Sequence, residues 1–251
     1  MTTDRKASRL VQRVRQRLYQ DLNPERMFAR DFIARCEKAS RILDIGCGRE
    51  APLLKNASGI RVGVDLVPDF VPSPGVRLIR GDCHALPFAD GSFDLIACTS
   101  VLEHITDPLV LFKEVRRVLA PGGQFVVLTP NRWDYVSVAS SVIPNSLHPS
   151  LVHTLTGRAA ADTFPTHYRA NTAGTLKRLA DDADLLVKSI GLFRQHPHYL
   201  YYSTPLYFVG VVIEQLLQRP FASLRPWIMA TFSRAGCVPP ISTAYPSASR
   251  E

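Results

Sequence analysis

Three aspartates each follow a short apolar run, and together they could hold a ligand. Asp44 lies in LDIGCG, Asp65 in VGVDL and Asp82 in RGDCHALPF. Asp65 could accept hydrogen bonds from both hydroxyls of a ribose. Asp44 lies where a cationic amino group could bind, and Asp82 could accept a hydrogen bond from an adenine amino group. One such aspartate is as readily a turn or helix cap, but three at successive strand ends suit adenosine that carries an amino acid better than a diphosphate.

Two glycines in the first motif favour a tight turn that brings a ligand close to the backbone. Gly46 and Gly48 supply the conformational freedom for such a turn. With Ala51 they also fit the G-x-G-x-x-A spacing of a nicotinamide dinucleotide site. The glycines alone therefore do not decide the ligand. Asp44 argues against a dinucleotide, because a carboxylate would gain little beside its pyrophosphate.

Alternating strand-length and helical patterns must position these residues. Five runs rich in Val, Ile and Leu are typical of strands buried on both faces: RILDIG, RVGVDL, VRLIRG, FDLIACT and QFVVLTP. The helical pattern LVLFKEVRRVL separates the last two and follows a start signal at Asp107 and Pro108. Residues 172–185 predict a further helix and 185–193 a further strand. These repeats indicate an α/β fold, a Rossmann-like, doubly wound, mostly parallel sheet with helices on both faces.

As a combined pattern, the motifs from about Arg41 to Asn131 resemble the class I S-adenosylmethionine-dependent methyltransferases, closest to the group that methylates small molecules, quinones and lipids. The pattern consists of ILDIGCG, VGVDL, GDCHALPFADGSFDLIACTSVLEHI and LAPGGQFVVLTPN. The resemblance implies S-adenosylmethionine as the cofactor. It implies that the residues around this cofactor are Asp44, Gly46, Cys47 and Gly48 at the methionine part, Asp65 and Leu66 at the ribose and adenine, Asp82 and Cys83 at the adenine, and Thr99 or Ser100 at the methyl end.

Glu50 departs from that pattern. Many members of the family have a third glycine where this chain has Glu50. We expect either a helix start that packs less tightly there, or an acid in the first turn that the helix dipole favours.

Histidines are the candidates for a base if the methyl acceptor is a hydroxyl, because its proton must then be removed. His104 comes first, since it follows the fourth strand at the binding edge, and His167 comes second. His148 and His153 are weaker candidates. Each could instead be a hydrogen-bonded loop or core residue. If the acceptor is a carboxylate or an amine, no base is needed, and Arg169 could orient an anionic group.

Composition bounds the size, partners and compartment of the protein. The 251 residues suffice for one α/β domain with additions, and the formal net charge of +8 favours anionic partners such as phosphates, acidic lipids or nucleic acid. The basic residues are not interleaved with aromatic residues, which does not favour nucleic acid. Five cysteines without a C-x-x-C spacing indicate neither a metal site nor a disulfide framework. We therefore expect a reduced, cytoplasmic compartment, in keeping with an N-terminus that lacks the apolar core of a signal peptide.

The predicted organisation has four parts. Residues 1–40 form a helical cap, 41–198 the cofactor-binding domain with an insertion at about 131–165, 199–237 an apolar helical extension, and 238–251 a disordered tail.

Two segments could contact a membrane. Near the N-terminus, arginines accompany Leu10, Val14 and Leu18 on one predicted helix face. The simpler interpretation is a solvated helix that rests this stripe on the domain. Residues 206–217 are too short to span a bilayer, which needs about 20 apolar residues, and they predict a core or lid helix or an interfacial contact. Both segments leave a peripheral membrane contact open.

The expected function is methyl transfer from S-adenosylmethionine to a small, glycan or lipid-linked acceptor, at an oxygen atom. Two alternatives remain: a membrane-associated protein that binds the cofactor without catalysis, and a nicotinamide-dependent oxidoreductase. The second leaves Asp82 and the LAPGGQF turn unexplained.

Overall fold

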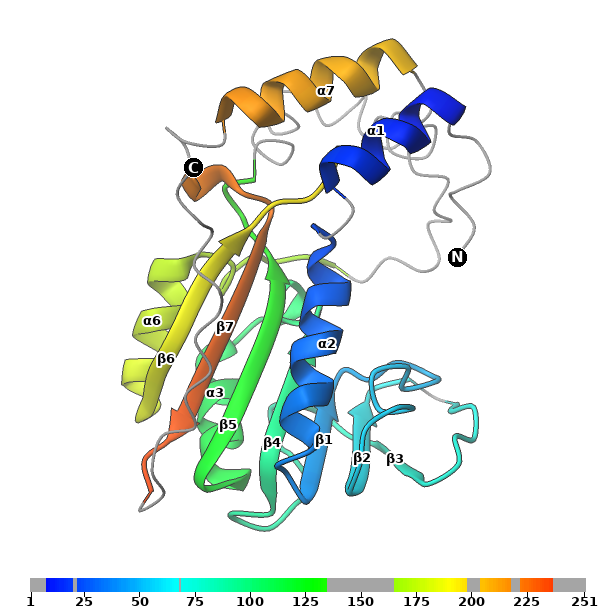
Figure 1. Ribbon diagram of the computed structural model, residues 1–251. Helices are drawn as coiled ribbons and strands as arrows, with labels where there is room; N and C mark the ends of the chain where they lie inside the picture. The colour runs from blue at the N-terminus through cyan, green and yellow to red at the C-terminus, as the bar shows by residue number, and fades with distance from the viewer. Residues whose placement is uncertain are drawn as a thin grey trace.

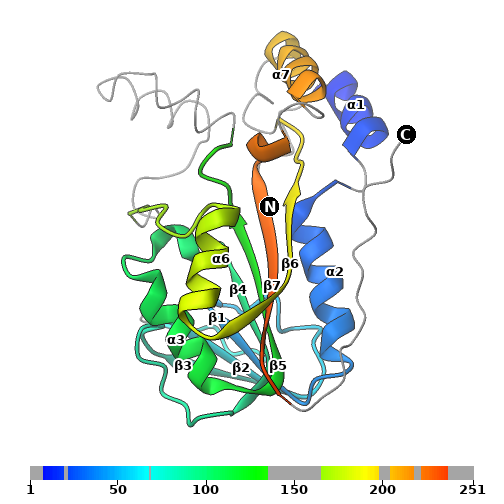
Figure 2. The ribbon, with the colours of Figure 1, turned by 90° about the vertical axis from the view of Figure 1, so that its left-hand side faces the viewer.

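The computed structural model describes residues 8–19, 22–67, 69–134, 165–197, 204–217 and 222–236. These residues form one seven-stranded sheet with helices on both faces (Figures 1 and 2). The strands are β1 (Arg41–Ile45), β2 (Ile60–Asp65), β3 (Val76–Arg80), β4 (Phe93–Thr99), β5 (Leu119–Pro130), β6 (Leu185–Phe193) and β7 (Trp227–Arg234). The helices are α1 (Arg9–Tyr19), α2 (Pro24–Cys36), α3 (Pro108–Val118), α6 (Ala173–Asp182) and α7 (Thr204–Leu217), with short 3-10 helices η1 (Leu102–His104) and η4 (Ala222–Leu224).

The strand order is β3-β2-β1-β4-β5-β7-β6, and β1 to β5 run parallel. The predicted α/β class and the mostly parallel sheet are therefore confirmed. The direction of the strand order reverses between β1 and β4, where Ile45 lies opposite Cys98. In open α/β sheets, ligands bind outside the carboxyl ends of the strands at such a reversal.

β7 corrects the prediction of a helical extension over 199–237. Residues 227–234 form a strand that lies between β5 and β6 and is antiparallel to both. Its Ile228, Met229 and Phe232 are buried in the core. The predicted domain boundary at 198 is also wrong, because β6 joins the sheet through β7. Local apolar patterning could not reveal this, since the pairing depends on strands that are distant in sequence.

α2 covers one face of the sheet, so the predicted 1–40 cap does not form a single helical unit with α1. Asn23 caps the start of the helix, and its side chain accepts a hydrogen bond from Arg26 N at 2.9 Å. Phe28, Phe32 and Cys36 pack in the same core cluster as residues of β1, β4 and β5. α1 lies elsewhere, next to α7 beyond the carboxyl ends of the parallel strands (Figures 1 and 2).

α3 and α6 cover the opposite face (Figure 2). α3 starts at the predicted signal: the Asp107 side chain accepts from Val110 N at 3.4 Å, and Pro108 is the first helical residue. The Phe112 ring packs edge-on against the rings of Phe125 and Phe232, each at 5.5 Å between centroids. These contacts bind α3 to the centre of the sheet.

Both expectations for Glu50 are wrong. Residues 46–59, which join β1 to β2, contain turns but no regular helix. Glu50 is exposed there and pairs with Lys55 at 2.9 Å. Most of the predicted insertion, and with it His148 and His153, lies outside the described residues, as does the predicted tail. None of the described helices has the length and apolar character needed to pass through a bilayer.

Candidate functional site

The turn after β1 is tied to β2 and packed against the segment after β4. The amides of Gly46 and Cys47 both donate to the Val64 carbonyl, at 2.8 and 3.3 Å. Gly46 has a φ of +72°, and a Cβ there would lie 2.0 Å from Val101 Cγ2. Gly48, with a φ of +66°, would meet nothing within 4 Å of an added Cβ. The first glycine is therefore required by packing, and the second leaves open space beside the backbone.

Asp44 is a buried carboxylate without a partner among the described residues. Only 3% of it is exposed. Burial, and then the charge of Asp65, raise the pKa of Asp44 to about 8. A buried carboxylate is costly unless a cation or hydrogen-bond donors compensate it. The end of β1 therefore offers a position that a cationic ligand group would stabilise.

Asp65 connects the end of β2 to the turn after β1. Its Oδ2 accepts a hydrogen bond from Gly48 N at 2.7 Å, and its Oδ1 accepts one from Val67 N at 3.1 Å. These bonds fix the carboxylate beside the open space at Gly48. Leu66, the next residue, is 58% exposed, so its side chain is accessible to a ligand at this edge.

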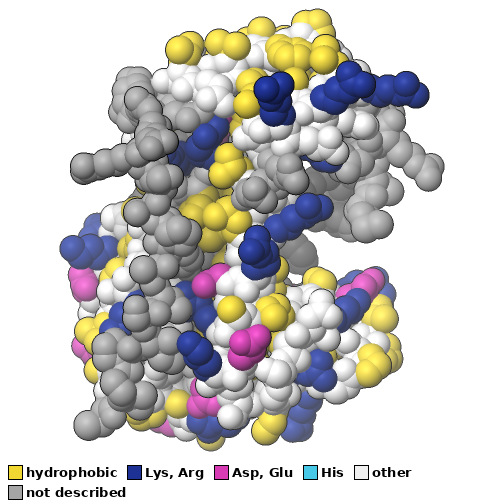
Figure 3. All heavy atoms as spheres, in the orientation of Figure 1, with side chains coloured by type: hydrophobic (Ala, Val, Ile, Leu, Met, Phe, Trp, Pro, Cys, Tyr) yellow, Lys and Arg dark blue, Asp and Glu magenta, His cyan; other side chains and the backbone are white. Residues whose placement is uncertain are grey.

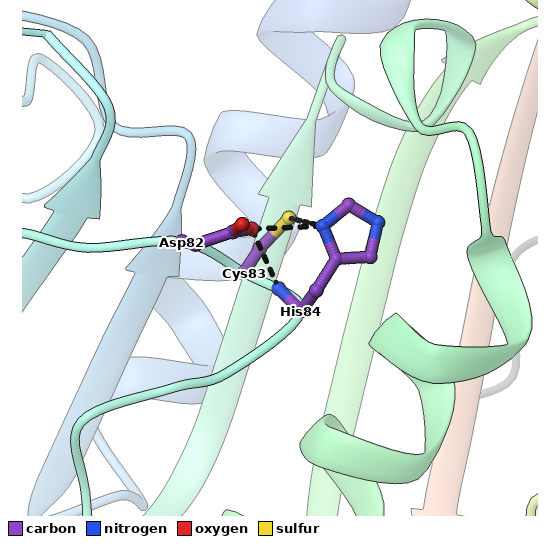
Figure 4. Close-up of side chains that lie close together, drawn as sticks. All are labelled: Asp82, Cys83 and His84. Carbon is purple, nitrogen blue, oxygen red and sulfur yellow. Dashed lines mark hydrogen bonds and ion pairs between the residues drawn. The ribbon is translucent and has the colours of Figure 1, made fainter.

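Asp82, Cys83 and His84 form a close cluster in the loop after β3 (Figure 4). Asp82 Oδ1 accepts from His84 N at 2.9 Å and lies 2.8 Å from His84 Nδ1, which also lies 3.9 Å from Cys83 Sγ. The His84 backbone amide is the first cause that holds the pKa of Asp82 below its usual value. Burial raises the pKa of the Cys83 thiol to about 12. His84 was not among the residues predicted from the sequence. One potential ligand atom from each of Asp82, Cys83 and His84 lies within 4.8 Å of the other two, and such a group could hold a metal ion.

Cys47 does not offer its side chain to the site. The residue is 4% exposed, and its side chain packs in the core on the α2 side of the sheet. A Cβ at Gly63 would lie 2.6 Å from Cys47 Sγ, which shows how closely the thiol packs on β2. The predicted contact with a cofactor is thus limited to the Cys47 backbone.

Thr99 is the last residue of β4, and Ser100 follows it. The Thr99 hydroxyl is buried and has no hydrogen-bond partner among the described residues, which is costly unless a ligand supplies one. Ser100 adopts a φ of +55°, uncommon outside glycine. Its amide donates to the Leu128 carbonyl at 2.9 Å, which fixes this turn on β5.

The structure brings together the two segments that carry His104 and His167, the first and second candidates for the base. His104 lies in η1, and its Nδ1 is 3.0 Å from the Pro165 carbonyl oxygen. Since a carbonyl only accepts, Nδ1 carries the proton, and Nε2 is the nitrogen that can take one up. The amide of His167 donates to the Glu103 carbonyl at 2.6 Å, so residues 165–168 pack on η1. The His167 side chain is exposed.

Glu103 belongs to a buried polar network to which sequence analysis gave no role. It is 7% exposed, and its Oε2 accepts from the Thr129 hydroxyl at 3.2 Å. Asn171 in turn donates to that hydroxyl at 2.6 Å. Burial is the first cause that raises the pKa of Glu103. The available signal was its place directly before His104, within the segment that resembles the methyltransferases, because its hydrogen-bond partners come from distant parts of the chain.

Two cavities lie apart from these residues. One, of about 280 Å³, lies at the amino ends of β4 and β5, away from the carboxyl ends that carry the predicted site. Its lining includes Arg35, Asp94 and Gln124. The other, of about 480 Å³, lies between α1 and α2 and is lined by Arg15, Gln16, Tyr19, Asn23, Arg26 and His196. Neither lining contains a predicted site residue.

Comparisons with known proteins concern mainly the segment that carries these motifs. A family described as "Methyltransferase domain" matches residues 43–127. The chain is 36% identical over 109 residues to an uncharacterized 37.1 kDa protein of a Streptomyces fradiae transposon, covering 38% of this chain and 31% of that protein. It is 33% identical over 128 residues to the ubiquinone biosynthesis O-methyltransferase of Xanthomonas oryzae, covering 44% of this chain and 51% of that enzyme.

A solved structure extends the likeness of fold to most of the chain. The geranyl diphosphate C-methyltransferase of Streptomyces coelicolor superposes with a TM-score of 0.57 at 17% identity, over 92% of this chain and 84% of that one. At this identity the likeness concerns the fold alone. The chain spans about a third to a half of the length of the curated relatives it matches.

Proposed function

We propose that this chain, which carries a class I S-adenosylmethionine-dependent methyltransferase domain, transfers the methyl group of S-adenosylmethionine to an oxygen atom of a small, glycan or lipid-linked acceptor. The observation that carries this proposal is the buried Asp44 carboxyl group, which has no partner among the described residues and lies at the reversal of the strand order. The methionine part of S-adenosylmethionine has a cationic amino group, which would favour the ionised form of this carboxyl and pair with it. A pyrophosphate would instead add a second anion, which argues against a nicotinamide dinucleotide.

The neighbouring residues fit the rest of the cofactor. Asp65 is held by two backbone amides at the end of β2, with acceptor capacity left for ribose hydroxyls. The open space beside Gly48 admits the ligand to the turn. The unpartnered Thr99 hydroxyl would gain a partner at the methyl end. Asp82 and Leu66 would border the adenine.

When bound, S-adenosylmethionine supplies a methyl group that the positively charged sulfur already activates. The chain must then orient the acceptor and exclude water, and positioning of this kind contributes about 7–11 kcal/mol. His104 Nε2 takes the proton from an acceptor hydroxyl, since Nδ1 is committed to the Pro165 carbonyl. The adjacent carboxyl of Glu103 stabilises the imidazolium that forms. His167, on the segment that packs against η1, is the second candidate base.

Transfer at oxygen has two supports. One is the tautomer of His104 with its proton on Nδ1, because Nε2 can then accept the proton of a hydroxyl acceptor. The other is the relative from Xanthomonas oryzae, which is named an O-methyltransferase.

Transfer of labelled methyl from S-adenosylmethionine into a cell extract, followed by separation of organic and aqueous fractions, tests the activity. Label in the organic fraction supports a lipid or quinone acceptor, and label only in the aqueous fraction supports a glycan or small metabolite. His104→Gln should lower the rate about 10²- to 10⁴-fold without weakening cofactor binding. Cofactor binding without any transfer would favour the non-catalytic alternative.

A further inference from the structure

α7 presents apolar residues to the outside and its charged residue to the inside. Tyr207, Val211 and Glu214 are buried. The opposite side holds five apolar side chains that are 43% to 70% exposed: Leu206, Val209, Val212, Ile213 and Leu216. Figure 3 shows hydrophobic side chains gathered along the top of the molecule, over α7. A surface helix of a soluble protein has the reverse arrangement.

Buried polar contacts fix α7 in this orientation. Glu214 is 5% exposed, and its Oε2 lies 2.6 Å from Arg194 Nη2. The Tyr19 hydroxyl of α1 donates to the same oxygen at 2.9 Å. The Arg194 guanidinium also lies 5.7 Å from the centre of the Tyr19 ring. Rotation of α7 to hide its apolar side would carry Glu214 away and leave the Arg194 guanidinium without this carboxylate, at a large cost.

α1 adds positive charge beside the apolar side of α7. Its residues Arg9, Arg13 and Arg17 are exposed, and the helix contains no acidic residue. Leu10 and Leu18 of the same helix are 52% and 44% exposed. In Figure 3 the basic side chains lie next to the hydrophobic ones at this end of the molecule. An apolar patch flanked by arginines matches the chemistry of an anionic lipid surface.

We propose that this docking face, formed by the five exposed apolar residues of α7 and by Arg9, Arg13 and Arg17, binds the surface of an anionic lipid membrane. Insertion of the apolar side chains removes them from water, and the arginines approach the lipid phosphates. A second copy of the chain fits less well, because symmetric pairing through this face would bring two sets of arginines together.

The docking face lies beyond the carboxyl ends of the parallel strands (Figures 1 and 2). A docked molecule therefore turns the edge with Asp44, Thr99 and His104 toward the lipid. This inference does not rest on the methyl-transfer activity, and its test uses binding alone.

Flotation of the full chain with phosphatidylcholine vesicles, with and without phosphatidylglycerol, tests the proposal. We expect binding to the anionic vesicles that weakens as salt rises. Arg13→Gln should lower the partition coefficient about fivefold, which corresponds to about 1 kcal/mol. Val209→Asp should lower it by more than about tenfold. Val110→Asp, the same substitution at a 38% exposed position of α3, should leave it unchanged.

Unfolding temperatures of the variants confirm that each remains folded. Three results would overturn the proposal. The first is no flotation of the wild type with anionic vesicles, and the second is an equal loss with Val209→Asp and Val110→Asp. The third is a wild-type protein that does not bind vesicles but sediments as a dimer, together with a Val209→Asp variant that sediments as a monomer. The face would then be a contact between two copies of the chain.

Discussion

At the scale of single residues, the buried Asp44 couples cofactor binding to pH. Its pKa of about 8 leaves the carboxyl mostly protonated near neutral pH in the ligand-free protein. A bound ammonium group favours the ionised form and lowers that pKa. Cofactor binding should therefore release a proton, and affinity should rise as pH increases toward 8. Calorimetry in two buffers of different ionisation enthalpy measures this release, which Asp44→Asn should abolish. Equal proton release in the variant would refute the assignment.

The same carboxyl should affect stability with a defined sign. Burial raises the pKa of Asp44 from 3.8 to about 8, so the folded state binds more protons than the unfolded state between these values. The ligand-free protein should thus lose stability as pH rises through this window. Urea unfolding at several pH values should show a smaller loss for Asp44→Asn, which cannot ionise. An equal loss of stability with rising pH in wild type and variant would contradict this.

Asp65 should matter for affinity more than for folding. Asp65→Ala removes the acceptor proposed for two ribose hydroxyls, and charge-assisted hydrogen bonds of this kind contribute about 1.5–3 kcal/mol each. We expect cofactor affinity to fall at least a hundredfold, by roughly the 3 kcal/mol that two such bonds contribute, while the protein remains folded. Asp69→Ala is the control, since Asp69 is an exposed acid that pairs with Arg49 after the same strand. Unchanged affinity of Asp65→Ala would refute the ribose assignment.

At the scale of elements, the turn after β1 tolerates no side chain at Gly46. Gly46→Ala combines a left-handed φ with a contact of 2.0 Å to Val101. We expect a loss of about 2–4 kcal/mol in the free energy of unfolding, measured in urea. Gly174→Ala in α6 meets nothing within 4 Å and should stabilise by about 0.5–1 kcal/mol. Equal effects at both positions would show that packing against Val101 is unimportant.

Local patterns predicted most elements because each has its own signal. The apolar runs of β1 to β5 and the start of α3 at Asp107 follow from residue type and spacing alone. β7 did not, because an antiparallel strand between β5 and β6 is specified by partners far away in the chain. The same distinction between local signals and distant partners applies to the residues of the candidate site. Asp44 and Asp65 stand out in sequence, whereas the buried state of Cys47 depends on how β2 packs against the turn.

At the scale of the whole molecule, one buried ion pair holds α7 to the rest. Glu214→Gln would leave Arg194 with an uncompensated charge, and breaking a buried pair costs about 3–5 kcal/mol. We expect hydrogen exchange to accelerate in α1 and α7 and to stay slow in β1 and β4. Asp69→Asn, which breaks an exposed pair with Arg49, should change stability by about 0–1 kcal/mol. Faster exchange throughout the sheet would show that α7 does not open independently.

The position of β7 also has a consequence for how the chain folds during synthesis. β6 has hydrogen-bonded neighbours only in β7 among the described strands, and residues 194–226 separate the two. A ribosome therefore releases β6, and the edge of β5, well before the strand that joins them exists. Until Trp227–Arg234 emerges, both edges present unpaired amides and carbonyls that could pair with other chains. The sheet is completed from the middle, in a late step that a nascent chain reaches only after α7 has been made.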